Sequence, residues 1–570
     1  MAVQRFKVSM NNAVFPLVST KAPRAVFVPQ LDSAPRQNRG FTGTDDSVDF
    51  NLAQILYGEN FMPIGEGVRS VGYESVVGAT VNNDFDQIFP LRDSEENTVL
   101  YSPARGQNYV YDDVASAWTT DPYADVWAPT VLAAGLDPAD SSVTYSYVDG
   151  KTFVCYSRLK SNAGSPTDMS IMQWNESTKA LVPATTILAN VPFAAGEIDG
   201  ISASNGFLLM WSGLSVAWAP YNGTAFDFQP FNNGAFTGAG NQIPEDVKGK
   251  ITALIAVPGG FIIFTARNAV AANYYAQSLS APWVFREISG AGGIEDYEQA
   301  TVYSSMGEVY AYTTAGMQKI SLNSAETVYP EISDFIAGRQ TERYDFGTHA
   351  LLKGGTTVDL FTKVTSISTR FVVVSYGYYP GIFSYAIVID LAMKRWGKLR
   401  IIHKDCFYYT QQTQPGALTY SMMHDVTYAA AGGDALVYDA SAAPTQATSV
   451  AQHSLAFLLS TGEVKVAVWT DQARTEDVAC LVIGRVQLTR SSNIQLNRVE
   501  AEGMESGNMF IAPSANGRTL TTPIALIDVE RVDGYLCQGE MIDCLNFNLM
   551  IEGSFNLTTL ILEATTTGKV

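Results

Sequence analysis

Two short sequence marks recur together along the middle of this chain, and their spacing constrains the fold more than any other feature. The first mark is a glycine just before an apolar run typical of a β-strand, and it stands at Gly150, Gly206, Gly260 and Gly307. The second is an Asp, Asn or Pro followed six residues later by a large apolar residue, as in Asp112 and Trp118, Asn175 and Leu181, Pro220 and Phe226, and Asp390 and Trp396. A polar residue or proline can open a hairpin turn, after which the apolar residue returns to the face of the sheet. The marks therefore predict hairpins that repeat along the chain.

The interval between successive glycine marks is close to the length of one four-stranded antiparallel blade of a β-propeller, which takes ~40–50 residues. Looser matches at Phe371 and Gly433 continue the series. Unrelated strands of a sandwich would not be expected to repeat both marks together. We therefore predict a β-propeller over residues 65–445, with about five to seven blades.

Helix signals are few and short, so the predicted fold class is all-β. Asp49 can cap a helix that includes Ile55 and stops at Gly58, and Pro330 precedes a similar apolar pattern that stops at Gly338. Elsewhere, runs of β-branched and aromatic residues alternate with Gly, Asn, Asp and Ser, as strands and turns do. With 46% apolar and 16% charged residues, the chain can bury a large core.

The apolar runs of the sequence become longer from about residue 446. In the stretch 484–490, Arg485 and Gln487 alternate with Val486 and Leu488. This alternation predicts a strand with one buried apolar face and one solvent-exposed polar face. Residues 446–570 are therefore predicted to form a separate antiparallel β-sandwich or barrel.

Residues 1–64 are predicted to form a basic extended arm followed by the short helix. Four prolines in the first 40 residues favour an extended path. Residues 41–150, in contrast, hold 18 acidic residues and three arginines, and the whole chain has a formal net charge of -20. We expect the arm to dock on an acidic partner surface, and residues 41–150 of a neighbouring copy are the first candidate. The alternatives are docking on a different ring of an assembly, stacked above its own, and a terminus that is simply frayed. The candidate docking residues are the cations Arg5, Lys7, Lys21, Arg24, Arg36 and Arg39.

Motifs for catalysis, cofactors and metals do not support an enzyme. The four histidines, His349, His403, His424 and His453, have no metal-ligand spacing, and no phosphate-binding glycine loop or nucleophile elbow occurs. Acidic pairs such as Asp45-Asp46 and Glu95-Glu96 do not form a calcium loop and are better explained as solvated loops. Aromatic residues lie inside strand runs without interleaved Lys or Arg, so a surface for stacking nucleic-acid bases is not indicated. We predict no catalytic residue, no cofactor and no metal site.

The cysteines and the hydropathy pattern indicate where the chain is made. The five cysteines are scattered and never in C-x-x-C spacing, which favours reduced thiols. No apolar stretch of about 18 residues occurs, and Met1 to Lys7 lead into no apolar signal region. We expect a soluble protein made in a cytoplasm, without stable membrane insertion; the resemblance described next implies that this is the cytoplasm of a bacterial host.

Five short motifs of the chain are GFIIF at 260–264, PWVFREI at 282–288, AYTTAGMQ at 311–318, PEISDF at 330–335 and IGRVQLTR at 483–490. Together they resemble the tail nozzle, or tail tubular B, proteins of short-tailed phages. An early segment, 67–73, is similar to the family's entry segment but lacks its Arg-Pro-Gly.

The resemblance implies a structural virion protein of the phage tail. It implies a homohexameric ring, or tail tube, that stacks below the portal and adaptor proteins, near tail fibres or spikes, and conducts and retains genomic DNA until ejection. DNA would pass through the channel without sequence recognition. An acidic composition suits such a conduit, because a lysine-rich lining would bind phosphates. The alternatives are a phage receptor-binding or glycan-degrading tail protein and a cellular propeller that serves as a scaffold.

Overall fold

The structure is a computed structural model, and it describes most of the strands of the chain. The described residues are 3–9, 26–27, 55–64, 67–80, 87–92, 98–104, 107–112, 117–120, 143–156, 171–194, 197–294, 302–303, 308–329, 332, 345–346, 349–350, 361–366, 371–377, 381–392, 395–412, 451–468, 479–487, 492–515, 518–519, 524–525, 530–532, 535–537, 542–544 and 546–569.

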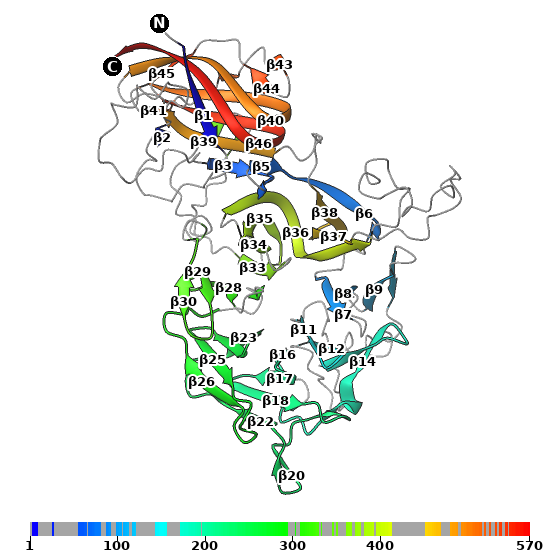
Figure 1. The fold of residues 1–570 in the computed structure, drawn as a ribbon. Coiled ribbons are helices and arrows are strands. Elements are labelled where there is room, and N and C mark those ends of the chain that lie inside the picture. Colours follow the sequence, from blue (N-terminus) through cyan, green and yellow to red (C-terminus); the bar gives the residue numbers. More distant parts are fainter. Residues whose placement is uncertain are drawn as a thin grey trace, which may run out of the picture.

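The prediction of an all-β protein is confirmed. The described residues form strands β1 to β46 and one 3-10 turn, η3 (Ala184–Thr186). Figure 1 shows a ring of small sheets at one end of the molecule and a smaller β-domain, which carries both termini, at the other. No helix in the described part of the chain has the length and apolar character needed to cross a membrane.

Five antiparallel sheets of the ring follow one another along the chain, each with four strands. Sheet one contains β7 (Phe89–Arg92), β8 (Thr98–Ala104), β9 (Gln107–Asp112) and β10 (Ala117–Thr120). Sheet two contains β11 (Val143–Val148), β12 (Lys151–Tyr156), β13 (Ile171–Asn175) and β14 (Ala180–Pro183). Sheet three contains β16 (Gly200–Ser204), β17 (Phe207–Ser212), β18 (Ser215–Pro220) and β22 (Gly240–Gln242). Sheet four contains β23 (Ile251–Val257), β24 (Gly260–Thr265), β25 (Ala269–Tyr274) and β26 (Trp283–Glu287), and sheet five contains β27 (Val302–Tyr303), β28 (Val309–Thr313), β29 (Gly316–Ile320) and β30 (Ala325–Thr327).

Two further sheets share one long strand, β36 (Arg395–Gln412). Its first half pairs with β35 (Phe383–Asp390), which continues through β34 (Phe371–Gly377) to β33 (Phe361–Ser366) as sheet six. Its second half pairs with β37 (Ala451–Leu459), which pairs with β38 (Glu463–Val468) in sheet seven. A register shift between His403 and Asp405 marks the passage from one sheet to the other, as a β-bulge does when it bends a strand.

The fourth strand of sheet seven comes from the other end of the ring. It is β6 (Gly72–Thr80), which precedes sheet one in the sequence and pairs antiparallel with β38. The ring is therefore closed by hydrogen bonds between its first and last segments. It extends to Val468, past the boundary predicted at residue 445.

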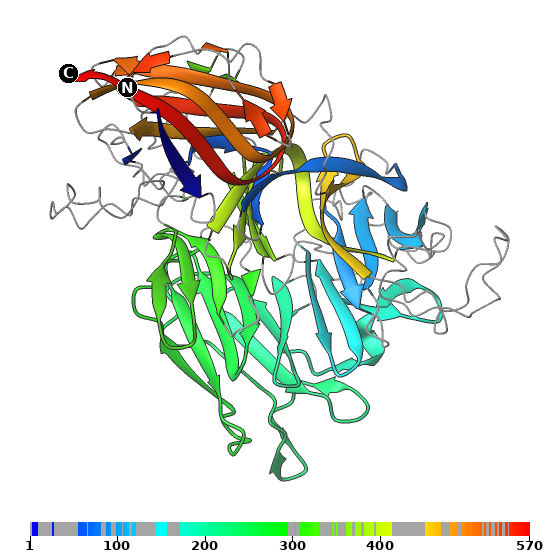
Figure 2. The ribbon, with the colours of Figure 1, turned by 45° about the horizontal axis from the view of Figure 1, so that its top comes forward.

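Seven hydrophobic clusters of described residues lie between neighbouring sheets and complete the circle. Figure 2 shows the sheets arranged around a common centre. In sheet order, the clusters join one to two, two to three, three to four, four to five, five to six, six to seven and seven to one. Each sheet of this closed ring thus packs against both of its neighbours, which does not contradict the predicted propeller; the propeller itself stays a prediction.

The two sequence marks correspond to two different hairpins. At Asp149-Gly150 and Asn205-Gly206 both residues have positive φ, so each pair forms a two-residue type I′ turn between the first and second strands of a sheet. Gly260 instead begins β24, where a Cβ would collide with the carbonyl oxygen of Ala272.

The second mark is the hairpin between the third and fourth strands of sheets one and two, and between β35 and β36 in sheet six. In each of these hairpins the apolar residue returns opposite the residue before the polar one. The pairs are Tyr111 with Trp118, Trp174 with Leu181, and Ile389 with Trp396.

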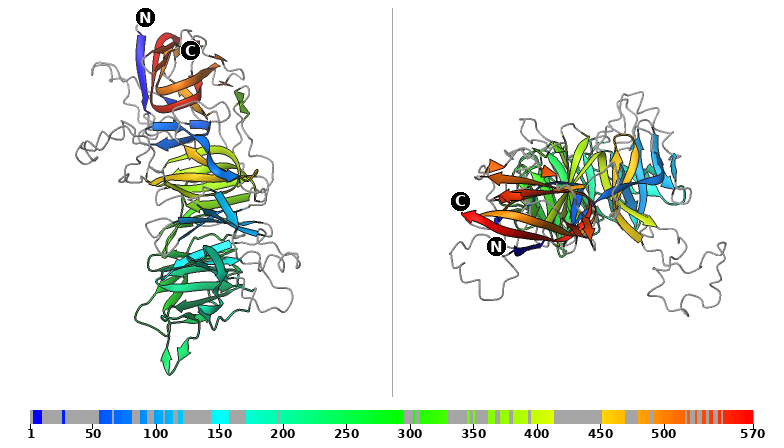
Figure 3. Two further views of the ribbon diagram at one scale, coloured as in Figure 1. Left: turned by 90° about the vertical axis from the view of Figure 1, so that its right-hand side faces the viewer. Right: turned by 90° about the horizontal axis from the view of Figure 1, so that it is seen from above.

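The C-terminal domain is built around two strands of 24 residues each, β40 (Ser492–Ala515) and β46 (Asn546–Lys569), which pair antiparallel along most of their length. β39 (Ala479–Gln487) pairs with β46 on the other side. The shorter strands are β41 (Arg518–Thr519), β42 (Ile524–Ala525), β43 (Glu530–Val532), β44 (Tyr535–Cys537) and β45 (Ile542–Cys544). Two views in Figure 3 show this domain beside the ring at the end that carries the termini.

Three short pairs lie outside these sheets. β15 (Leu188–Ala189) pairs parallel with β19 (Phe226–Asp227). β20 (Phe231–Asn232) and β21 (Ala235–Phe236) form a hairpin, and so do β31 (Asp345–Phe346) and β32 (His349–Ala350).

The prediction of a short helix that includes Ile55 and stops at Gly58 is wrong. Ile55–Glu59 is a strand, β3, which pairs antiparallel with β39. The local pattern of a capping residue, apolar residues and a glycine fits a short helix or a short strand. The strand forms because β39 offers backbone hydrogen bonds along its edge. The second predicted helix, which stops at Gly338, lies outside the described residues apart from Ile332.

We expect Phe457→Ala to lower the free energy of unfolding of the ring by about 3–5 kcal/mol, because it opens a cavity between sheets six and seven. Phe457 is fully buried and lies edge-on to Tyr73 of β6 and to His403 of β36. Urea unfolding followed by fluorescence would measure the change. Ile402→Ala, at a side chain that is 57% exposed on β36, is the matched control and should change stability by less than about 0.5 kcal/mol. Equal effects of the two substitutions would contradict this placement of the core.

Candidate functional site: the junction between the ring and the C-terminal domain

The chain segment 55–80 joins the ring to the C-terminal domain. β3 pairs with β39 of the C-terminal domain, and β4 (Phe61–Ile64) then pairs with β36 of the ring. β5 (Gly67–Ser70) pairs with both β4 and β46, and β6 closes the ring. Four consecutive strands thus alternate between the two domains.

Two buried charged side chains, Glu59 and Lys398, lie at this junction together with the exposed Arg400. The carboxylate of Glu59 on β3 contacts the ammonium of Lys398 on β36 at 3.8 Å and the guanidinium of Arg400 at 3.2 Å. Lys398 is 2% exposed and Glu59 is 5% exposed. The Lys398 ammonium also lies 4.4 Å from the centre of the Tyr385 ring, a cation–π contact. Because a buried charge is costly unless it is paired, these contacts hold β3 of one domain against β36 of the other.

Neutral hydrogen bonds complete the junction. The side-chain oxygen of Asn60 accepts the backbone N–H of Arg400 at 2.9 Å and the hydroxyl of Tyr73 at 3.0 Å. Ser70 of β5 both donates to the carbonyl of Phe555 at 3.2 Å and accepts its N–H at 3.0 Å. Residues from β5, β6, β36 and β46 are therefore tied into one hydrogen-bonded unit.

Two glycines allow the backbones to approach so closely. A Cβ at Gly58 would overlap the aromatic ring of Phe61. A Cβ at Gly397 would collide with the backbone carbonyl oxygen of Phe61. Phe61 is fully buried between them. The junction is consequently a packed joint.

Burial shifts the pKa values of two groups at the junction. Desolvation lowers the pKa of Lys398 to about 8, and the nearby Glu59 carboxylate only partly opposes it. Desolvation raises the pKa of the Cys480 thiol to about 12, and the charge of Glu59 adds to this shift. Because both groups are buried, we assign them to the stability of the joint.

A serine and a histidine inside the ring have the geometry of a nucleophile and its base. Nδ1 of His403 lies 2.8 Å from the carbonyl of Ile401, which can only accept, so Nδ1 carries the proton. Nε2 then accepts the hydroxyl of Ser375 at 2.8 Å. The exposed fractions of Ser375 and His403 are 1% and 0%, so both belong to the core and the serine is shielded from substrate. The expectation that the chain is not an enzyme stays a prediction.

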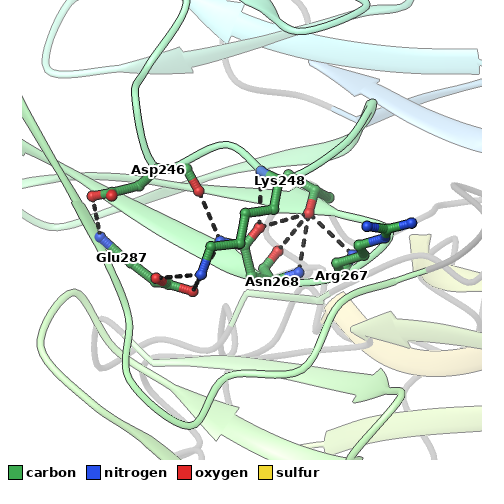
Figure 4. A network of polar contacts seen from close by, with 6 residues as sticks. Asp246, Lys248, Arg267, Asn268 and Glu287 are labelled. Atoms are coloured by element: carbon green, nitrogen blue, oxygen red, sulfur yellow. Dashed lines mark hydrogen bonds and ion pairs between the residues drawn. The ribbon is translucent and has the colours of Figure 1, made fainter.

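A second polar network lies in sheet four and is shown in Figure 4. The amide of Asn268 donates to the carbonyl of Asp246 at 2.8 Å and to Glu287 at 3.2 Å. Lys248 contacts the same Glu287 carboxylate at 2.6 Å, and its hydrogen bond is the main reason why the pKa of Glu287 lies below its usual value. Figure 4 shows the side chain of Arg267 pointing away from this network. The contacts fasten a surface loop to β24, β25 and β26.

Of the six candidate docking residues of the arm, the structure describes two, Arg5 and Lys7. Arg5 and Lys7 lie on β1 (Val3–Ser9), which pairs with β46 of the same chain, and β2 (Val26–Phe27) pairs parallel with β39. The described parts of the arm are thus tied to the chain's own C-terminal domain. Docking of the arm on a neighbour stays a prediction, and four of its cations lie outside the described residues: Lys21, Arg24, Arg36 and Arg39.

Several features of the site were not found from the sequence. Glu59, Lys398 and Cys480 come from distant segments, and no local pattern relates them. Among the described residues, no group of three or more His, Cys, Asp or Glu could hold a metal ion. The exposed hairpin Phe231–Phe236 had a usable signal, because Asn233-Gly234 is a strong two-residue turn between short apolar pairs.

Comparisons with known proteins add little to these observations. No family model and no curated protein sequence matches the chain. Two solved extracellular domains from B. thetaiotaomicron, of a putative hybrid two component system and a putative one component system, are similar in structure with TM-scores of 0.37 and 0.36. Their sequences are 9% and 8% identical to this chain. The matches cover 84% and 91% of this chain, and the chain spans 60% and 66% of the lengths of these two structures. A eukaryotic initiation factor is similar with a TM-score of 0.28 and 10% identity, over 61% of this chain and 87% of that one. We draw no functional argument from these three.

The lowered pKa of Lys398 predicts how stability depends on pH. Between about pH 8 and the ordinary lysine value near 10.4, the unfolded chain binds more protons at this residue than the folded chain does. The contribution of Lys398 to the free energy of unfolding therefore rises with pH across that window, by up to about 1.4 kcal/mol per pH unit.

The matched variant for this prediction is Lys398→Met, which keeps the length of the side chain and removes the titrating group. We expect the stability of the intact protein to rise relative to this variant between pH 8 and 9.5, measured by urea unfolding in parallel buffers. Cys480 is present in both proteins, so its own titration largely cancels in the comparison. A stability difference that is flat or falls with pH would show that Lys398 is not held in this environment.

Proposed function

We propose that this chain is a structural virion protein of a short-tailed phage. Copies of it form a ring, the nozzle or tail tube, as a homohexamer below the portal and adaptor complex. The ring conducts the genomic DNA and retains it until ejection. Tail fibres or spikes are its neighbours in the virion.

The observation that carries the proposal is where the family-like motifs fall in the fold. The motif at 260–264 coincides with β24, a middle strand of sheet four, and the motif at 282–288 coincides with β26, an outer strand of the same sheet. The motif at 311–318 lies on β28 and β29 of sheet five, and the motif at 483–490 begins on β39 of the C-terminal domain. The motifs thus fall on strands of sheets four and five of the ring and on one strand of the C-terminal domain.

The rigid architecture also supports a structural role. The ring buries a core between every pair of neighbouring sheets, and the junction adds paired charges and reciprocal hydrogen bonds between the domains. A tube subunit must keep its shape under the load of packed DNA. Its net charge of -20 also suits a conduit, because an acidic or neutral wall does not bind phosphates.

Electron microscopy of the purified full chain, or of the virion, tests the proposal. We expect rings with a six-fold axis and a central opening. A trimeric fibre would instead favour the receptor-binding or glycan-degrading alternative, and a persistent monomer over a wide range of concentrations would favour a scaffold. Either result would reject the nozzle proposal.

The arm gives a second test of assembly. We expect the combined change of Lys21, Arg24, Arg36 and Arg39 to Gln to leave the chain folded, because β1 stays paired with β46, and to weaken ring formation severalfold at low salt. Analytical ultracentrifugation at two salt concentrations would measure it.

The control for the arm removes the same number of cations from the ring, by changing Lys179, Lys250, Arg267 and Lys319 to Gln. Exposed ion pairs such as Lys250 with Asp199 contribute about 0–1 kcal/mol each, so this variant should stay folded and assemble normally. Equal assembly of the arm variant, the control and the unmodified protein would show that the arm's charges have no part in the ring.

A further inference from the structure

The hairpin formed by β20 and β21 presents two aromatic side chains to solvent. Phe231 and Phe236 are directly opposite in the antiparallel pair, so they project from the same face, and their rings meet edge-to-face at 5.4 Å. They are 50% and 52% exposed. Figure 1 shows this hairpin projecting beyond the ring at the end of the molecule opposite to both termini.

A second loop contributes exposed apolar side chains beside the first. It joins β25 to β26 and carries Tyr275 and Leu279, which are 58% and 59% exposed. Leu279 lies against Gly238, which follows the hairpin, since a Cβ at that glycine would be 3.6 Å from its Cδ2 atom. Ile243 follows the same hairpin and is 57% exposed. We call this set of five residues the tip surface.

Neither segment of the tip surface contains a charged residue. Residues 228–244 and residues 268–285 hold no Asp, Glu, Lys or Arg, although 16% of the chain is charged and the net charge is -20. At that overall fraction, segments of this combined length would carry about six charges. A nucleic acid is therefore an unsuitable partner, because its binding needs cations. The rim of a protein interface usually carries charged residues that set register, and within these two segments there are none.

The backbone of the hairpin is largely satisfied within the hairpin itself. Asn233 and Gly234 both have positive φ and form a two-residue type I′ turn. At its base, Thr237 donates its N–H to the carbonyl of Pro230 at 3.2 Å and its hydroxyl to the carbonyl of Gln229 at 2.6 Å. Paired backbone groups can enter an apolar environment at lower cost than free ones.

We propose that the tip surface is a peripheral contact site for an uncharged lipid surface. Phe231 and Phe236 enter the boundary between headgroups and acyl chains, Leu279 and Ile243 add exposed apolar area, and Tyr275 lies at the level of the headgroups. The hairpin lies along the surface, because its phenylalanines share one face while Asn232 and Ala235 occupy the other. The contact is reversible and crosses no bilayer. It does not depend on the proposed role in the tail.

Flotation of the full chain with phosphatidylcholine vesicles tests this site. We expect the intact protein to float with the vesicles equally at 0.05 M and 0.5 M NaCl, conditions that span a large change in ionic screening. Replacing part of the phosphatidylcholine by phosphatidylserine should weaken the binding, because the chain is acidic. The double variant Phe231→Ser, Phe236→Ser should reduce the partition coefficient about tenfold or more.

Two further variants make the test specific. Ile402→Ser removes an equally exposed apolar side chain from β36 and should float like the intact protein. Phe231→Trp, Phe236→Trp keeps aromatic side chains and should retain binding. Failure of the intact protein to float, or undiminished flotation of the serine variant, would overturn the proposal. Self-association that is lost in the serine variant, without vesicle binding, would overturn it too and assign the tip surface to contacts between copies.

Discussion

The pairing of β6 with β38 is the constraint on which the rest of the structure depends. The two strands stand at residues 72–80 and 463–468, with the other sheets of the ring between them in the sequence. Cores between sheets one to six can form from neighbours in the chain, whereas sheet seven needs strands from both ends. Closing so long a segment costs conformational entropy, which is recovered only when the last two interfaces of the ring are buried. We therefore regard the closed ring as one cooperative unit.

The closing strand is also the last of four strands that connect the two domains. β3 and β5 pair in the C-terminal domain, and β4 and β6 pair in the ring, so closing the ring and attaching the C-terminal domain involve the same 26 residues. Buried charges are an expensive way to hold such a joint, and an apolar contact of the same volume can be as stable. Glu59 and Lys398 are the buried pair, and the hydrogen bond that the exposed Arg400 donates to Glu59 adds orientation, because charge-assisted hydrogen bonds are geometrically specific.

A tail subunit of the proposed kind needs rigidity within a copy and specific surfaces between copies. Rigidity follows from the closed ring and its joint. The arm, whose first cations lie on β1, is at the end with both termini, and the tip surface, for which we propose a lipid contact, lies at the other end. Ser375 and His403, which have the geometry of a nucleophile and its base, are both buried in the core.

The sequence by itself determined the all-β class, because Asp149-Gly150 and Asn205-Gly206 encode their turns locally and the mark at Asp390 and Trp396 encodes a hairpin by its spacing. Long apolar runs likewise indicated β39, β40 and β46 of the C-terminal domain. Only the tertiary structure decided that Ile55–Glu59 is a strand and that Lys398 meets Glu59. The physical reason is range: turn geometry depends on a few neighbouring dihedral angles, whereas an edge that needs a partner, or a buried charge that needs a counter-ion, is satisfied by residues hundreds of positions away.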